Sequence, residues 1–271
     1  FVYLWYLMAV LVLEIWFDYR QDLVRTWQAS TGAKRWLYGA LTLWSDDVSP
    51  EALRLDDRIG RTITIIGIPS AFLLHGYVGF IFGSVKANPW WSTPLMPVVF
   101  LFSAIVSGIA AVMLLYMVLS WRRGKLADMV CLDTIARYLF YAFVVDFSLE
   151  ILDLIHRIYE AGDSFGALDF MVKTRLFMSH IVVQICLGTI VPILMLAAVQ
   201  IGKFSESARR RIYAIAGTLT LIGIFAMRWN VVIGGQLFSK SFLGYTTYKL
   251  EFATREGLLV SLVLLIMPFF I

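Results

Sequence analysis

The stretch that decides the fold is "YAIAGTLTLIGIFAMRWNVVIGGQ", residues 213–236, in which Arg228 is the single charged residue. A helix of about 20 apolar residues crosses the hydrocarbon core of a bilayer. The stretch therefore predicts a transmembrane helix. Arg228 does not suit lipid surroundings, because a charge near the bilayer centre costs about 3 kcal/mol even on lenient insertion scales. We therefore expect Arg228 to face the interior of a helical bundle.

The composition of the whole chain is that of a membrane protein. Of its 271 residues, 60% are hydrophobic and 15% are charged, whereas soluble domains have about 45–50% apolar and about 25% charged residues. The nine Trp and twelve Tyr residues suit a protein with two membrane interfaces. Cys131 and Cys186 lack CxxC spacing, which argues against a thiolate metal site or an iron–sulfur cluster. No basic groove with interleaved aromatic residues suggests nucleic-acid binding.

We predict an all-α, polytopic transmembrane helical bundle with about seven spans, forming a single integral-membrane domain over residues 1–271. The apolar runs fall at 1–17, 60–84, 94–120, 136–159, 174–200, 210–236 and 257–271. The first and last runs look cut short, so we interpret the chain as a fragment. The polar segment 18–59 is expected to be a cytoplasmic loop, in which "GAKRWLYGALTLW" (32–44) forms a short amphipathic helix.

The distribution of Lys and Arg between alternate loops predicts the orientation in the membrane. One set of loops (18–59 with Arg61, 121–135 and 201–211) contains fourteen of them, and the other set (85–93, 160–173 and 237–256) contains five. The positive-inside rule places the first set in the cytoplasm.

This topology places most of the polar side chains within the spans at one depth, in the outer half of the membrane. They are His75, Asp146, Glu150, Asp153, His180, Gln184, Arg228, Asn230 and Gln236. Asp146, Glu150 and Asp153 have i, i+4, i+7 spacing, which puts them on one helix face. Ionisable residues within spans are functional by default, so we expect a polar pocket. The alternative is that these residues only pair with one another to hold the bundle together.

A histidine and a carboxylate at one depth suit a quinol, whose two hydroxyl groups need hydrogen-bond and proton acceptors. We predict His75 as the first acceptor and Asp146 or Glu150 as the second, with His180 a weaker candidate. His156 is expected to be interfacial. A cytochrome b with two haems needs four histidines at two depths, whereas this chain has three at one depth. A single haem between His75 and His180 is a disfavoured alternative.

We expect Arg228 to pair with a carboxylate of the 136–159 helix and to border the pocket. On an α-helix, Gln236 returns to nearly the same face as Arg228, whereas Asn230 points about 160° away. Gly234 and Gly235 are expected to let a neighbouring group approach the backbone.

Two neighbouring stretches carry a family resemblance: "PSAFLLHGYVGFIFG" (69–83) and "ANPWWSTPLMPVVFLFSAIVSGIAA" (87–111). They resemble the NrfD/PsrC family of quinone-interacting membrane subunits, which includes the membrane subunit of polysulfide reductase. A third, "MRWNVVIGGQLFSKSFLGYTTYKLEF" (227–252), resembles most the DsrP branch, the membrane subunit of the DsrMKJOP complex. The resemblance covers nearly the whole chain from about residue 60 onward.

The resemblance implies a helical bundle in the cytoplasmic membrane of a prokaryote, with no haem or iron–sulfur cluster of its own. Its substrate would be menaquinone or ubiquinone. Its partners would be an extracytoplasmic, ferredoxin-like iron–sulfur subunit and, in the DsrP branch, multihaem cytochrome c and cytochrome b-type subunits, in sulfur-linked anaerobic respiration. His75 and Asp146 match positions of family site residues, and Arg228 would lie near the site. Family members carry an acidic residue where this chain has Ile81.

Two other functional classes remain open from the residues alone. A transporter or proton pathway would show broken helices in two corresponding halves. Pro69 and Pro192 interrupt spans, but their flanking sequences are not alike. A structural anchor for peripheral redox subunits would use the polar cluster only for packing.

Overall fold

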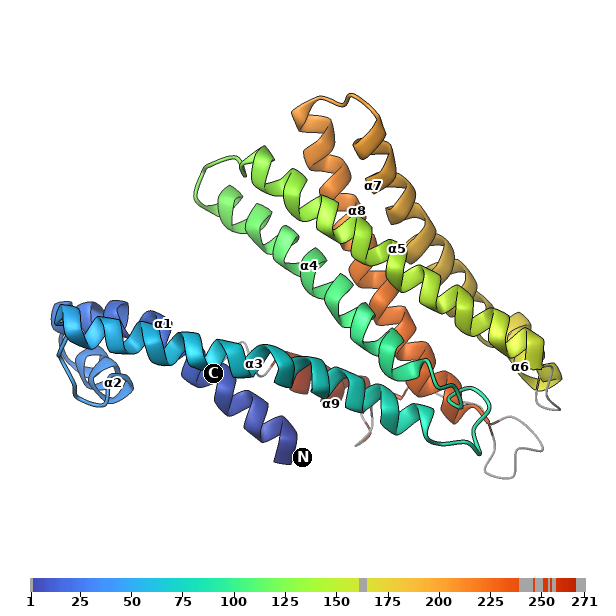
Figure 1. Cartoon of the computed structure of the whole chain (residues 1–271), viewed down its shortest axis with the longest axis horizontal. Helices are drawn as coiled ribbons and strands as arrows, with labels where there is room; N and C mark the ends of the chain where they lie inside the picture. Colours follow the sequence, from blue (N-terminus) through green and yellow to red (C-terminus); the bar gives the residue numbers. More distant parts are fainter. Residues whose placement is uncertain are drawn as a thin grey trace. The chain divides into compact units, whose positions relative to one another are not determined.

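The computed structural model describes residues 2–160, 165–238, 246, 251, 252, 254 and 257–266. Every regular element in this part of the chain is a helix, which confirms the predicted all-α class (Figure 1). The elements are α1 (Val2–Ala29), α2 (Ala33–Leu41), α3 (Pro50–Gly83), α4 (Met96–Arg122), α5 (Met129–Glu160), α6 (Phe165–Thr174), η1 (Phe177–Ile190), α7 (Val191–Ile201), α8 (Glu206–Trp229), η2 (Asn230–Gly234) and α9 (Leu258–Ile266). The two η segments are π-helical.

Four continuous helices are long and apolar enough to cross a membrane: Pro50–Gly83, Met96–Arg122, Phe177–Ile201 and Glu206–Gly234. They coincide with four of the seven predicted spans. The long helices α1 and α5 lie at two further predicted positions. The last predicted span is described as far as Ile266, in α9. The chain therefore forms a polytopic helical membrane protein.

The polar segment 18–59 is largely helical. Helix α1 continues to Ala29, and α3 begins at Pro50, about ten residues before the apolar run. The short helix α2 lies within the stretch expected to form an amphipathic helix. Helices continue beyond their apolar parts because the backbone hydrogen-bond ladder does not depend on hydropathy. Ser49 Oγ, for example, accepts a hydrogen bond from the Ala52 N–H at the start of α3.

The first compact unit comprises residues Phe1–Phe80. Polar contacts join α1 to α3 within it: Tyr3 donates to the Ser70 carbonyl at 2.7 Å, and Thr64 donates to Glu14 at 2.6 Å. Nearer the far end of α1, Arg20 forms an ion pair with Asp56 at 2.7 Å. The carboxylate of Glu14, which lies within an apolar helix, thus receives a hydrogen bond from its neighbour.

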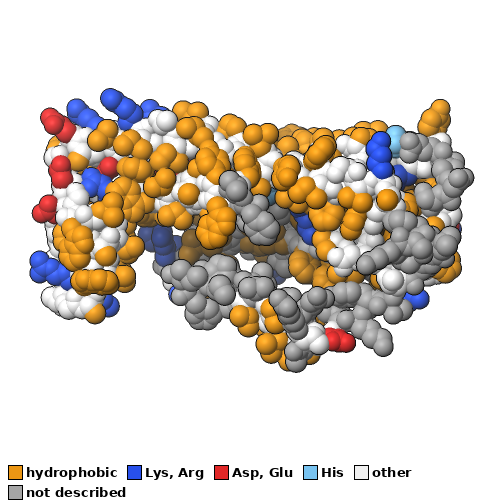
Figure 2. Space-filling model, turned by 90° about the horizontal axis from the view of Figure 1, so that it is seen from below, with side chains coloured by type: hydrophobic (Ala, Val, Ile, Leu, Met, Phe, Trp, Pro, Cys, Tyr) orange, Lys and Arg blue, Asp and Glu red, His pale blue; other side chains and the backbone are white. Residues whose placement is uncertain are grey.

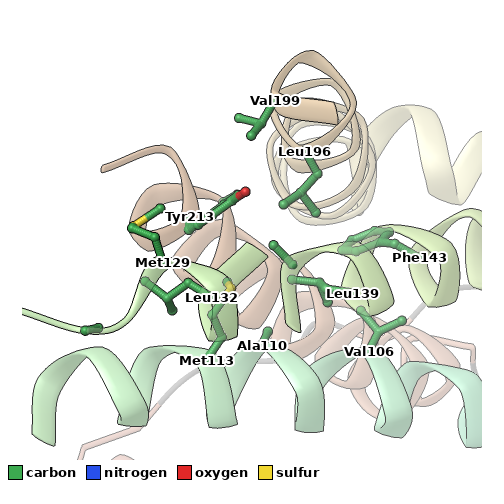
Figure 3. Close-up of a cluster of buried hydrophobic side chains, with 13 residues drawn as sticks. Val106, Ala110, Met113, Met129, Leu132, Leu139, Phe143, Leu196, Val199 and Tyr213 are labelled. Atoms are coloured by element: carbon green, nitrogen blue, oxygen red, sulfur yellow. The ribbon is translucent and has the colours of Figure 1, made fainter. Parts of the chain in front are cut away.

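The second compact unit comprises residues Ile81–Ile271 and contains a bundle of α4, α5, η1 with α7, and α8. Its apolar core draws on α4, α5, α7 and α8 (Figure 3). On α5 the buried residues recur at helical spacing, which gives this helix one apolar stripe. The fully buried members are Val106, Ala110, Met113, Leu132, Ala136, Leu139, Phe143, Leu196, Tyr213 and Ala216.

The bundle helices run alternately up and down. The turn between α4 and α5 lies at the same end as the turn between α7 and α8 (Figure 1). Arg210 joins these two turns by donating to the Ala127 carbonyl at 3.0 Å. At the other end, Asn88 donates to the Gly235 carbonyl at 2.8 Å. Within this unit, the α4–α5 and α7–α8 turns therefore lie at one end, and the loop before α4 meets the residues after η2 at the other. Which end is cytoplasmic stays a prediction.

Helices η1 and α8 cross at two glycines. A Cβ atom added to Gly188 would lie 2.2 Å from the Cα of Gly223. Such an approach requires glycine on both helices, and small residues at crossings are typical of membrane bundles. This crossing sets the spacing of the two helices that carry Gln184 and Asn230.

Hydrophobic side chains cover most of the described surface in the view of Figure 2. Large apolar side chains point outward along the bundle helices, including Leu115, Tyr141, Leu194 and Phe225. A soluble protein rarely exposes contiguous apolar areas of this extent. The surface is therefore suited to contact with lipid.

Candidate functional site

A polar network lies inside the bundle of the second unit, with Gln184 at its centre. Gln184 Oε1 lies 2.9 Å from His180 Nδ1 and accepts from Asn230 Nδ2, also at 2.9 Å. Gln184 Nε2 donates to Glu150 at 3.4 Å. The network thus joins η1, η2 and α5. It brings together three of the predicted site residues, namely His180, Glu150 and Asn230.

The π-helical segments determine how these side chains are directed. In a π-helix each N–H bonds to the carbonyl five residues earlier, so each turn takes in an additional residue. Gln184 lies within η1, and Asn230 is the first residue of η2. Isolated π-turns are frequent at functional sites. The α-helical spacing of about 100° per residue therefore does not apply within Phe177–Ile190 or Asn230–Gly234.

The loop before α4 closes over η2. The indole N–H of Trp90 donates to the Asn230 carbonyl at 2.9 Å, and that of Trp91 donates to the Val231 carbonyl at 2.6 Å. The Trp90 ring also meets the His180 ring edge-to-face, with centroids 5.5 Å apart. Trp90 therefore contacts two members of the network, the Asn230 backbone and the His180 ring.

Gly234 and Gly235 make this contact feasible, which agrees with the prediction that a neighbour approaches the backbone there. A Cβ atom at Gly235 would lie 2.1 Å from the Trp91 indole, and one at Gly234 would lie 3.2 Å from Trp90 Nε1. The neighbouring group is the loop that carries the two tryptophans.

The three carboxylates on the inner face of α5 have different surroundings. Asp146 is 2% exposed, and no donor in the described residues bonds to its Oδ1. Glu150 receives the Gln184 amide. Asp153 pairs with Arg157 at 2.8 Å and accepts a hydrogen bond from Thr93. Asp153 is therefore bound by a cation and a hydroxyl group, whereas Asp146 has an acceptor oxygen to spare.

Arg157 holds the tryptophan loop as well as Asp153. Its two terminal nitrogens donate to the carbonyls of Pro89, at 2.8 Å, and Trp90, at 3.1 Å. A guanidinium has donors on several edges, so one side chain can bind a carboxylate and two carbonyls together. The ion pair at the end of α5 thus fixes the loop that covers η2.

Arg228 is half-buried inside the bundle, but the prediction of a carboxylate partner is wrong for the described residues. Its Nη2 donates to Ser103 Oγ at 2.8 Å and to the Phe100 carbonyl at 3.0 Å, both on α4. Its guanidinium also lies over the Phe100 ring, 4.2 Å from the centroid. Asp146 interacts with it electrostatically but forms no ion pair with it. The rotation of α8 directs the guanidinium to α4 and leaves the carboxylates to other partners.

The remaining predicted residues have separate positions. Asn230 is buried against η1, whereas Arg228 contacts α4. The two side chains thus point in different directions, as their angular spacing predicted. Gln236 is exposed, whereas Arg228 is half-buried. That the two share a helix face stays a prediction. His156 is exposed near the end of α5.

His75 belongs to the first unit, on α3. Its Nδ1 lies 2.9 Å from the Ala71 carbonyl, one turn earlier. A carbonyl only accepts, so Nδ1 carries the hydrogen, and Nε2 of a neutral ring is left as an acceptor. Its predicted pairing with Asp146 or Glu150 stays a prediction.

The sequence profile described as "Polysulphide reductase, NrfD" matches residues 1–240. The chain belongs to the NrfD family. One of the selenate reductase subunits of Mesobacillus selenatarsenatis is 27% identical to it over 279 residues, which cover 95% of this chain and 63% of that protein. Protein NrfD of Escherichia coli is 33% identical over 115 residues, which cover 42% of this chain and 32% of that protein. The chain thus spans less than two thirds of the length of these curated relatives.

Membership of the NrfD family confirms the family-level resemblance and, with the apolar helices, a multi-pass membrane protein. Closeness to the DsrP branch stays a prediction. For this NrfD-family chain, sequence analysis noted Gln184 only as one of the polar side chains at a shared depth. It assigned no role to Asn88, Trp90 or Trp91. The available signal was the "NPWW" sequence at 88–91, which places an amide and two indole N–H donors next to one another in the chain.

The arrangement in this NrfD-family protein can bind a ligand that donates hydrogen bonds. Asn230 Oδ1, like Asp146 Oδ1, is buried and lacks a donor among the described residues. Buried acceptors without partners are costly and call for an explanation. Within the described residues, no group of three His, Cys, Asp or Glu side chains could hold a metal ion.

Proposed function

We propose that this chain is the quinone-interacting membrane subunit of a multi-subunit oxidoreductase. The observation that carries the proposal is the buried pair of acceptors without donors, Asp146 Oδ1 and Asn230 Oδ1, inside a lipid-facing bundle. A quinol presents two hydroxyl donors on an apolar ring, so it offers the missing hydrogen bonds and suits apolar surroundings. Membership of the NrfD family supports the same conclusion.

Oxidation of a quinol releases two electrons and two protons. We assign the protons to Asp146 and Glu150, which lie one turn apart on α5. Asn230 would bind a hydroxyl group, and His180 would take part through the Gln184 amide. Arg228 would contribute positive charge near Asp146. The electrons would leave to an iron–sulfur partner subunit on the extracytoplasmic side. Reduction of a quinone would use the same groups in reverse.

We further propose which substrate and which kind of complex this subunit serves. We propose menaquinone or ubiquinone as substrate, in the cytoplasmic membrane of a prokaryote. The resemblance to the DsrP branch favours sulfur-linked respiration with cytochrome partners. The name of the selenate reductase relative instead suggests oxyanion reduction by the partner subunits. His75 stays a candidate quinol ligand, whereas Gln236, being exposed, is not included.

The test is quinol-dependent electron transfer by the intact complex. Replacing Asp146 by Asn or Glu150 by Gln should lower kcat by about 10²-fold or more, the usual contribution of a proton-transferring group, without loss of subunit assembly. Asp169→Asn is the matched control, because Asp169 lies on α6, outside the network, and pairs with the exposed Lys173. Unchanged quinol turnover in both carboxylate variants would falsify the assignment.

A quinone-analogue binding measurement separates this function from the other two classes. A transporter and a structural anchor need no quinone site, so neither predicts saturable binding. We expect the complex to bind the analogue and expect Asn230→Ala to weaken that binding. His75→Ala provides the separate test of the histidine on α3: normal turnover in this variant would remove His75 from the site.

A further inference from the structure

Gln184 contacts three side chains whose states depend on one another. It is 5% exposed, and its Oε1 faces His180 and Asn230 while its Nε2 faces Glu150. A primary amide has an acceptor on one side and donors on the other. Rotating the amide by half a turn exchanges these roles at nearly the same atomic positions. The state of one neighbour therefore constrains the other two.

The observed arrangement is the one required by an ionised Glu150. An ionised carboxylate only accepts hydrogen bonds, so Gln184 must turn Nε2 towards it. Oε1 then faces the other two residues, and Asn230 must present its Nδ2. His180 must carry its hydrogen on Nδ1, which leaves Nε2 of the neutral ring as an acceptor.

A second arrangement satisfies the same contacts when Glu150 is protonated. Its hydroxyl group can then donate to Gln184 Oε1, and Nε2 turns towards the other two residues. Asn230 presents Oδ1, the atom that has no donor in the first arrangement. His180 must present a bare Nδ1, so its hydrogen is on Nε2. The two arrangements differ by one proton on Glu150.

We propose that Gln184 is a positioning residue that couples the protonation of Glu150 to the tautomer of His180. One proton is added at Glu150 Oε1, both amides rotate, and the single N–H hydrogen of the neutral His180 ring is transferred from Nδ1 to Nε2. The imidazole stays neutral, so the network gains one proton in total. In quinol chemistry, which this step takes from the proposed function, a quinol hydroxyl group supplies that proton. His180 Nε2 then changes from acceptor to donor as the reaction proceeds.

The surrounding charges do not bond to the amide. On α5 the charged neighbours of Glu150 are Asp146, one turn earlier, and Asp153, which is bound by Arg157. Arg228 of α8 bonds to α4. From η1, His180 is the titratable group that bonds to Gln184. The amide is therefore the hydrogen-bonded link between Glu150 and His180 in the described network.

The test is ¹⁵N NMR of the full chain in its complex with ¹⁵N-labelled histidine, assigned with a His180→Asn variant. Glu150 protonation is followed by the infrared carboxyl band that Glu150→Gln removes. As Glu150 becomes protonated, the two His180 nitrogens should exchange their pyrrole-type and pyridine-type shifts. Gln184→Leu and Gln184→Met should abolish this exchange, whereas Gln200→Leu, at an exposed position on α7, should preserve it.

A constant His180 tautomer across the Glu150 titration in the unaltered protein would overturn the proposal, as would formation of imidazolium in step with Glu150. Persistence of the exchange in a folded Gln184 variant would overturn it too. The unaltered protein carries the main test, so the inference does not depend on the variants folding. Because no quinone is needed, failure here is distinct from failure of quinol turnover in the Asp146 and Glu150 variants.

Discussion

The Trp90 indole N–H donates to the backbone carbonyl of Asn230 at 2.9 Å, although 140 positions separate the two residues in the chain. The contact joins the loop before α4 to the π-helical end of α8. It places an aromatic ring against His180 and fixes the backbone that presents the Asn230 amide to Gln184. The outer covering of the site is therefore built from a loop, and its inner side from helices.

Loss of this indole donor should destabilise the protein. We expect Trp90→Phe to lower the free energy of unfolding by about 1 kcal/mol, because a hydrogen bond between neutral groups contributes about that much. Thermal unfolding in detergent measures the change. Trp121→Phe is the control, since Trp121 is 78% exposed. Equal effects of the two substitutions would contradict the role of Trp90.

The ion pair between Asp153 and Arg157 should contribute more than its short sequence spacing suggests. Arg157→Ala should lower the free energy of unfolding by about 3 kcal/mol, because it leaves a largely buried carboxylate without its cation and frees two loop carbonyls. Lys173→Ala removes an exposed i, i+4 pair with Asp169 and should change stability little. Denaturant unfolding measures the free energy of unfolding of both variants. A change in Arg157→Ala as small as that in Lys173→Ala would contradict the stabilising role of the Asp153–Arg157 pair.

The glycine crossing of η1 and α8 should not tolerate a side chain. Gly188→Ala would force apart two backbones and should destabilise the bundle by about 2 kcal/mol or more. Gly108→Ala is the matched control, because nothing lies within 4 Å of a Cβ atom there; its effect should be neutral or slightly stabilising. Thermal midpoints of the two variants provide the comparison, and a stable Gly188→Ala protein would contradict the described crossing.

Arg228 should depend on Ser103 rather than on a carboxylate. Ser103→Ala removes a hydrogen bond to a charged group and should cost about 1.5 kcal/mol. Ser107→Ala should be nearly neutral, because the Ser107 hydroxyl bonds only within its own helix. Arg228→Lys should also destabilise, since lysine lacks the planar fork that bonds to α4 and stacks on Phe100. Unfolding measurements test all three variants, and a neutral Ser103→Ala would indicate another partner for Arg228.

The predicted orientation can be tested with a native cysteine. Cys131 is exposed near the start of α5. It belongs to the segment 121–135, which is predicted to be cytoplasmic. In a Cys186→Ser background, a membrane-impermeant maleimide should label Cys131 only from the cytoplasmic side. Lys86→Cys should be labelled only from the opposite side. The reverse pattern would invert the topology while leaving the fold unchanged.

The sequence by itself determined the class, the family and the positions of most of the long helices. Hydropathy is a local property, so runs such as 94–120 and 210–236 predicted helices close to α4 and α8. Motifs such as "LLHGYVGF" and "NPWW" carried the family resemblance. Consecutive spans predicted that successive loops alternate between two ends, and the charge count predicted which end is cytoplasmic, which stays a prediction.

Only the tertiary structure decided which polar residues pair with one another. Arg228 contacts α4, Arg157 contacts the carbonyls of the loop before α4, and Gln184 joins Glu150 to Asn230. These pairings depend on the rotation of each helix about its axis and on close crossings such as Gly188 with Gly223. Burial also differs between neighbouring polar residues, since Asn230 is buried against Gln184 whereas Gln236 is exposed. Long-range contacts such as Trp90 with Asn230 have no local signal, because they form only when distant segments pack together.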